Sequence, residues 1–276
     1  MTQVLIIAAK EIRDSLRNRW LLMISLILLI LSLGVTFGGG AVGGVLAVPE
    51  LGNVISGLVT LSVFMLPLAA ILLSYDAFVG EEEAGTLLLM LTYPLSRFQL
   101  LMGKFIGHGT LLALACLLGF APAGVLLYLF GGVAGMAVLT GFGNFMVSGL
   151  LLALVFILLG YLVSLSVREK ARALGLLLFI WFALVLIYDL ALLAAVVSLA
   201  DVMSRSSLNL LILTNPADLF RAINLATIEA GSQSSGSALA ALSQTGLSLG
   251  GLYLLMLCWV TLLLSACQLR FHYKSL

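Results

Sequence analysis

Six long apolar stretches dominate this chain of 276 residues. A helix needs about 20 mostly apolar residues to cross the hydrocarbon core of a bilayer. Charged residues make up only 9% of the chain, too few to cover a water-soluble globule of this size, since soluble domains carry about 25%. The sequence therefore predicts one all-α polytopic transmembrane domain over residues 1–276, with spans at 20–48, 54–78, 105–130, 138–167, 173–199 and 247–269.

The distribution of Lys and Arg predicts the orientation of these spans. Eleven of the thirteen basic residues precede span one, follow span six, or lie between spans two and three or four and five. Only Arg205 and Arg221 fall on the other side. The positive-inside rule then places both termini in the cytoplasm, as in a multi-pass protein of the bacterial inner membrane. A net charge of +1 without a basic stripe argues against nucleic-acid binding.

Residues 1–19 predict an amphipathic helix. One face carries an apolar series at three- and four-residue steps: Leu5, Ala8, Ala9, Ile12, Leu16 and Trp20. The other face carries Lys10, Glu11, Arg13, Asp14, Arg17 and Asn18. Such a helix lies along a membrane surface, here the cytoplasmic one. The alternative is that its basic residues only mark the cytoplasmic side.

Residues 79–97 predict a short cytoplasmic helix between spans two and three. Gly80 can end span two, and three glutamates follow where a new helix begins, which the helix dipole favours. Leu87, Leu88, Met90 and Leu91 form its apolar body. Tyr93 and Pro94 end it, and Ser96 caps the next helix. Such a helix can enter a cleft in a partner and transmit movement; the alternative is a solvated loop.

Residues 200–246 form the long hydrophilic segment on the external side. Asn215 can cap a helix that has Pro216 at its first position, Asp218 in its first turn and Gly231 at its end. Leu219, Phe220 and Ile223 share an apolar face, and residues 231–237 predict a Ser/Gly-rich loop. An external gate or partner-docking surface would involve Asn215, Pro216, Asp218, Phe220 and Arg221. The alternative is a helix that lies on the outer leaflet.

Asp189 is an acid within the apolar fifth stretch. Ionisable residues inside membrane spans mark functional sites by default. From Ala173, a rise of 1.5 Å per residue places Asp189 about 24 Å across the bilayer, near the outer interface. An interfacial position and a functional intramembrane role, such as proton transfer, both remain open.

Glycines at four-residue spacing predict close helix packing, either within the chain or at a dimer contact. Such pairs include Gly39 and Gly43, Gly40 and Gly44, and Gly103 and Gly107. A dinucleotide site is not indicated, because no strand precedes the G-x-G-x-x-G at 38–43. The Gly103–Lys104 pair is followed by Phe105, so no P-loop is present. ATP and Mg²⁺ would therefore be bound by another chain.

The side chains also offer little for a metal or cofactor. Three cysteines lie in apolar runs, and the two histidines and nine methionines are not clustered as copper ligands would be. We therefore expect neither catalytic residues nor a resident metal or cofactor in this chain.

A longer pattern covers the segment after span two: acidic residues, Gly-Thr-Leu, a leucine, Pro-x-Ser-Arg and Gly-Lys. Its residues are Glu83, Gly85, Thr86, Leu87, Leu91, Pro94, Ser96, Arg97, Leu100, Gly103 and Lys104. This pattern resembles the permeases of ABC-2 type ABC transporters. The resemblance implies a homodimer with two cytoplasmic ATPase subunits. It also implies that 79–97 is the coupling helix, contacting the ATPase through Glu81, Glu82, Glu83, Gly85, Thr86, Leu87, Met90 and Leu91.

Within that family, residues 8–22, the glycine-rich end of span one and residues 215–221 are similar to a particular subgroup. Its permeases serve maturation of the copper sites of nitrous oxide reductase. This resemblance implies a periplasmic partner that handles the copper.

Other functions remain open. A generic ABC-2 exporter of a lipid or small hydrophobic molecule would share the cytoplasmic features. An ion-coupled secondary transporter should show paired intramembrane charges or broken helices in matching halves. A membrane enzyme would need a converging nucleophile, base or metal cluster.

Overall fold

The computed structural model describes residues 2–42, 50–93, 95–198, 211–231 and 247–274, and all regular structure within these residues is helical. Six helical segments are long and apolar enough to cross a membrane, which confirms the predicted polytopic all-α fold. The elements are α1 (Thr2–Arg17), α2 (Trp20–Val42), α3 (Leu51–Ser74), α4 (Val79–Glu83), α5 (Thr86–Thr92), α6 (Arg97–Phe130), α7 (Gly135–Ser164), α8 (Lys170–Phe182), the π-helical η1 (Ala183–Ile187), α9 (Tyr188–Ser198), α11 (Pro216–Gly231) and α13 (Leu249–Tyr273).

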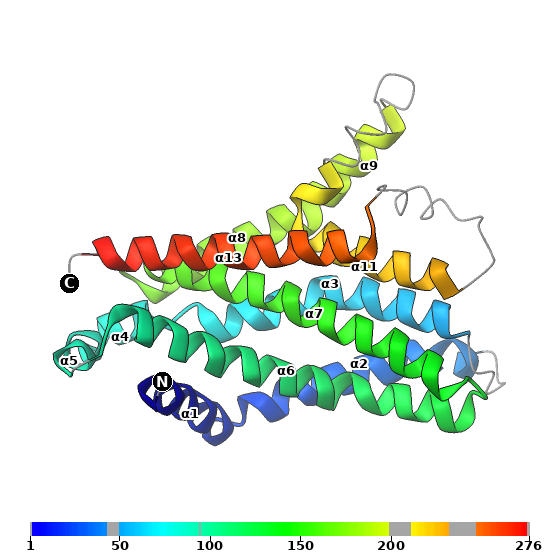
Figure 1. The fold of residues 1–276 in the computed structure, drawn as a ribbon, viewed down its shortest axis with the longest axis horizontal. Coiled ribbons are helices and arrows are strands. Elements are labelled where there is room, and N and C mark those ends of the chain that lie inside the picture. The colour runs from blue at the N-terminus through cyan, green and yellow to red at the C-terminus, as the bar shows by residue number, and fades with distance from the viewer. Residues whose placement is uncertain (1, 43–49, 94, 199–210, 232–246, 275–276) are drawn as a thin grey trace.

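The long helices form an elongated bundle whose two ends differ (Figure 1). α1, α4, α5 and both chain termini lie at one end, which we call the terminal end. At the other end, called the opposite end, α11 packs against α3, α7 and α13, while α9 diverges from the bundle (Figure 1). An even number of spans requires both termini to lie at the same end.

Glycines on α6 allow α1 and α2 to approach closely. A Cβ atom at Gly103 would lie 2.6 Å from Cβ of Ile7, and one at Gly119 would lie 2.5 Å from Cβ of Leu28. Gly107 faces Ala8 and Glu11 of α1 in the same way. The pair at 103 and 107 therefore serves packing within the chain. Gly43 and Gly44, in the other predicted pairs, lie outside the described residues.

Capping moves the start of the third span well ahead of its apolar stretch. Ser96 accepts a hydrogen bond from the Gln99 N–H at 3.1 Å, and the Gln99 side chain accepts from the Ser96 N–H at 2.9 Å. This capping box starts α6 at Arg97 rather than at residue 105. The prediction that Ser96 caps this helix is confirmed. Hydropathy had identified only the apolar part of a longer helix.

The single helix predicted over 79–97 is instead two short helices, α4 and α5. Gly85 between them has a φ of 70°, a left-handed conformation that glycine adopts without strain. This break separates the glutamates of α4 from the leucines of α5, so that they do not share one continuous helix. The predicted end at Pro94 lies outside the described residues.

Candidate functional site

The terminal end contains a buried lysine that joins three helices. Lys104 on α6 is only 2% exposed. Its ammonium donates to Glu11 of α1 at 2.9 Å and to Glu81 of α4 at 2.7 Å. Lys10 of α1 adds a weaker contact with Glu81 at 3.7 Å. Because a buried ammonium is costly without paired charges, these contacts fix α1 and α4 against α6.

Glu11, on the predicted charged face of α1, is turned towards α6 and the protein interior. Its side chain is 13% exposed and lies 3.5 Å from His108 Nε2, while His108 Nδ1 is 2.8 Å from the Tyr161 hydroxyl on α7. Burial alone would raise the pKa of Glu11. The hydrogen bond to His108 and the charges of Lys104, His108 and Lys10 outweigh burial and hold that pKa well below its usual range.

Serine and glutamate side chains connect α4 to three further helices. Ser164 of α7 accepts from the N–H groups of Phe78 and Val79 at 3.1 and 3.0 Å, which caps the start of α4. Glu83 accepts from the Lys170 N–H at the start of α8 at 2.8 Å. Glu82 forms an ion pair with Lys274, just beyond the last turn of α13.

Arg97 completes this end by capping α13. Its guanidinium donates to the carbonyls of His272 and Lys274 at 2.8 and 3.1 Å, and also to that of Phe271. The Ser-Arg pair of the sequence pattern thus has two structural roles, since Ser96 starts α6 and Arg97 closes α13.

The exposed surface of α5 is apolar. Leu88, Leu89 and Tyr93 are 56%, 61% and 64% exposed, whereas Leu87 is 1% exposed and anchors the helix in the core. Gly85 and Thr86 are also exposed, and Met90 and Leu91 are half-buried. Within the predicted contact set, Leu87 and the three glutamates contact the chain itself, whereas Gly85 and Thr86 are accessible to a partner. Sequence reasoning left Leu88, Leu89 and Tyr93 out of this set, because a seven-residue helix is too short for its buried face to be read from periodicity.

At the opposite end, Asn215 joins α11 to a π-helical turn in the fifth span. The wide turn of η1 leaves the carbonyl of Leu184 open to the side-chain amide of Asn215, at 2.8 Å. The side-chain oxygen Oδ1 of Asn215 accepts from the Ala217 N–H at 3.0 Å, and its side-chain amide nitrogen also donates to Asp218 at 2.9 Å. The predicted helix with Asn215 as cap, Pro216 first and Gly231 last is confirmed.

Asp189 is paired across this junction. Arg221 of α11 donates to Asp189 of α9 at 2.9 Å and to Asp218 at 2.8 Å. Asp189 is 47% exposed and Asp218 only 8%. Burial raises the pKa of Asp218, although Arg221 opposes the shift. The sequence grouped Asp218 and Arg221 in the external segment and singled out Asp189 alone, and gave no indication that the three form one ion-pair cluster.

The apolar face of α11 packs inside the bundle instead of on a lipid surface. Leu219, Phe220 and Ile223 are fully buried. The Asn224 amide donates to Ser148 of α7 at 2.9 Å, and Asn144 of α7 donates to Thr227 at 2.7 Å. α7 therefore makes polar contacts with α4 at one end and with α11 at the other. Residues 232–237 of the predicted loop lie outside the described residues.

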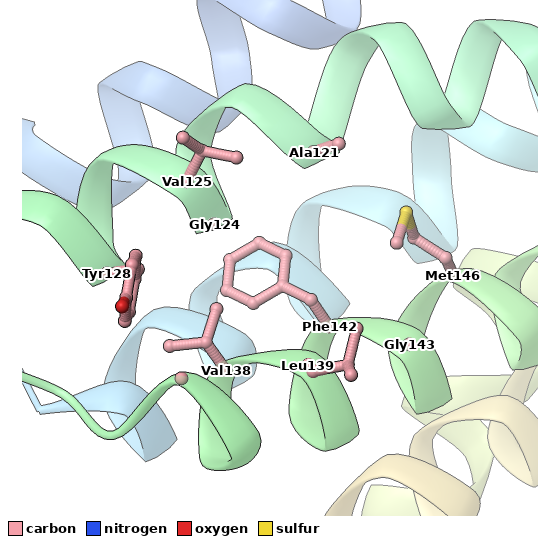
Figure 2. A pocket seen from close by; sticks show the side chains of 10 residues that line it. Ala121, Gly124, Val125, Tyr128, Val138, Leu139, Phe142, Gly143 and Met146 are labelled. Carbon is pink, nitrogen blue, oxygen red and sulfur yellow. The ribbon is translucent and has the colours of Figure 1, made fainter.

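A pocket of about 360 Å³ lies between α6 and α7 towards the opposite end. Figure 2 shows Tyr128, Phe142 and Met146 around it. The thioether of Met146 is the one sulfur in its lining, which includes neither histidine nor carboxylate. Copper(I) prefers several soft ligands, so this pocket suits a hydrocarbon group better than a metal.

These features define a class: a polytopic helical membrane subunit with a short helix that exposes apolar side chains at one end and a packed polar junction at the other. The family model for ABC-2 family transporter proteins matches residues 5–276. The chain belongs to this family of ABC transporter permeases. It is 45% identical over 264 residues to the probable ABC transporter permease protein NosY of Stutzerimonas stutzeri, with 94% of each chain covered. The protein of the same name from Pseudomonas aeruginosa (strain PAO1) is 46% identical over 260 residues, again with 94% of each covered.

Proposed function

We propose that this permease couples ATP hydrolysis by a separate ATPase subunit to a conformational change across the membrane. The observation that carries the proposal is α5, which presents Leu88, Leu89 and Tyr93 outward at the terminal end while Leu87 anchors it in the core. A protruding apolar helix end that is fixed to the bundle can fill a partner's cleft and pass on its movement. ATP and Mg²⁺ are bound by that partner.

The terminal end faces the cytoplasm in this proposal, because the positive-inside rule places the basic loops and both termini there. The chain is then a multi-pass protein of the bacterial inner membrane, and α1 lies along its cytoplasmic surface. The exposed side chains Leu5, Ile6 and Leu16 give α1 an apolar face for lipid. Two copies of the chain form a homodimer, with one ATPase subunit for each copy.

We further propose that the movement serves maturation of the copper sites of nitrous oxide reductase. The support is the similarity to the two NosY permeases. A periplasmic partner handles the copper and meets this chain at α9 and α11, where Asp189, Asp218 and Arg221 form an ion-pair cluster. Export of a lipid or small hydrophobic molecule is the second candidate, favoured by the apolar pocket between α6 and α7.

Affinity purification from native membranes in mild detergent tests these proposals. We expect two ATPase subunits per two permeases, together with a periplasmic protein. Leu88→Asp with Leu89→Asp should release the ATPase while the permease stays folded in the membrane, and Leu247→Asp, at an exposed leucine that precedes α13 at the opposite end, is the matched control. Recovery of the ATPase alone would favour the exporter. Equal ATPase recovery with the α5 variant would contradict the docking role of α5.

A further inference from the structure

Helix α4 has only five residues, yet its contacts reach five other helices. Ser164 of α7 caps its first N–H groups, and Glu81 is held by Lys104 of α6 and lies near Lys10 of α1. Glu82 reaches the end of α13 through Lys274, and Glu83 reaches the start of α8. Each of the three consecutive glutamates therefore contacts a different part of the bundle.

Burial separates Glu81 and Glu82 from the docking surface, whereas Glu83 is exposed. The side chains of Glu81 and Glu82 are 15% and 26% exposed, and their partners Lys104 and Lys274 are 3% and 9% exposed. Leu88 and Leu89 of the neighbouring α5 are more than half exposed, whereas Leu87 is buried. Leu88 and Leu89 therefore face outward, and Glu81 and Glu82 of α4 face their own chain.

We propose that α4 is a hub that distributes movement of α5 to the bundle, with Glu81 acting on α1 and α6, Glu82 on the end of α13, and Glu83 on the start of α8. This inference rests on the proposed function, since it requires a partner that moves α5. The glutamates are positioning residues within the chain and do not bind the ATPase. Gly85, in its left-handed conformation, connects α5, which receives the movement, to α4, which distributes it.

The three links differ in chemistry, and this difference makes the proposal testable. Glu83 accepts from a neutral backbone N–H, which the amide oxygen of glutamine can also accept. Glu82 faces a lysine ammonium, for which a neutral amide is a weaker partner than a carboxylate. Glu83→Gln should therefore keep its link, whereas Glu82→Gln should weaken its link, and alanine should remove either one.

Single spin labels near the two helix ends can follow the links separately. Leu269→Cys lies near the end of α13 and Arg172→Cys lies in the first turn of α8, and both side chains are exposed. Each label is placed in a Cys258→Ser background, because Cys258 is an exposed free thiol. The measurement is the change in label mobility when a non-hydrolysable ATP analogue is added to the complex with its ATPase.

We expect the wild-type complex to respond at both labels. Glu82→Ala should abolish the response at residue 269 and keep the response at 172, and Glu83→Ala should do the reverse. Glu83→Gln should respond as the wild type does. Asp14→Ala, at a half-exposed carboxylate on the same end of the molecule, is the control and should keep both responses.

The possible failures are distinguishable. If both alanine variants lose the two responses equally, or keep both, the hub is wrong while ATP coupling stands. If the wild-type complex, with its ATPase bound, responds at neither label, the proposed coupling fails and the hub fails with it. Variants are compared only at equal ATPase recovery and equal elution profile, so that a general loss of folding is not counted as a loss of one link.

Discussion

Replacing Lys104 by methionine should be among the most damaging single changes in this protein. The variant keeps the size and apolar stem of the side chain but leaves Glu11 and Glu81 buried without their shared ammonium. At a separation of 2.8 Å, midway between the two observed distances of 2.9 and 2.7 Å, each pair is worth about 6 kcal/mol at an effective dielectric constant of 20. Desolvation offsets much of this attraction, and breaking a buried pair costs about 3 to 5 kcal/mol net.

The assay is thermal unfolding of the purified permease in detergent. For a chain of this size, a loss of 3 to 5 kcal/mol corresponds to a fall in Tm of about 6 to 20 °C. Lys10→Met is the matched control, because Lys10 is 46% exposed and exposed ion pairs contribute only about 0 to 1 kcal/mol. Adding Glu11→Gln and Glu81→Gln to Lys104→Met should recover most of the loss. A Tm for Lys104→Met equal to that of Lys10→Met would refute this reasoning.

Three further predictions concern other parts of the structure. The pKa of Glu11 is lower in the folded protein than its ordinary value of 4.5, so its ionised form adds stability above pH 4.5 that is lost as the pH falls below 4.5. The Tm difference between wild type and Glu11→Gln should therefore shrink between pH 6 and pH 3.5. A constant difference would contradict the assignment. Gly103→Ala should lower the Tm, because the new methyl group would meet Ile7 at 2.6 Å, whereas Gly143→Ala, with no atom within 4 Å, should not; equal Tm values would argue against close packing of α1. Arg221→Ala should lower the free energy of unfolding by about 3 to 5 kcal/mol in the same assay, because it leaves the buried Asp218 without its cation. Asp189→Asn should lower it less, because Asp189 is 47% exposed. The reverse order would contradict the assigned burial.

Local rules predicted the elements well. Hydropathy identified the six spans, although α6 extends beyond its apolar stretch, and the starts of α6 and α11 followed from capping residues, since Ser96 and Asn215 satisfy nearby N–H groups that the sequence itself identifies. The family resemblance added the prediction that residues 79–97 contact an ATPase. These signals are all local, and so they could be read without knowing the tertiary structure.

The partners of the charged residues could not be predicted in this way. The pattern of α1 assigned Glu11 to a charged face but did not indicate its partner Lys104, which lies 93 residues later in the chain. Asp189 and Arg221 were assigned to different segments, and only the packing of α11 against the fifth span brings them together. Such pairs depend on which helices become neighbours, and local patterns of residue type do not specify that.

Hydrogen–deuterium exchange of residues 211–231 tests the central claim most directly. The wild-type permease is measured in complex with its ATPase, with and without a non-hydrolysable ATP analogue, and the Leu88→Asp, Leu89→Asp variant, which should not retain the ATPase, is mixed with the same amount of ATPase as a negative control. Transmission from α5 to the opposite end predicts that the analogue changes exchange in α11 of the wild type and has no effect there in the variant. Exchange in α11 that is the same with and without the analogue, while the ATPase stays bound at α5, would contradict the claim.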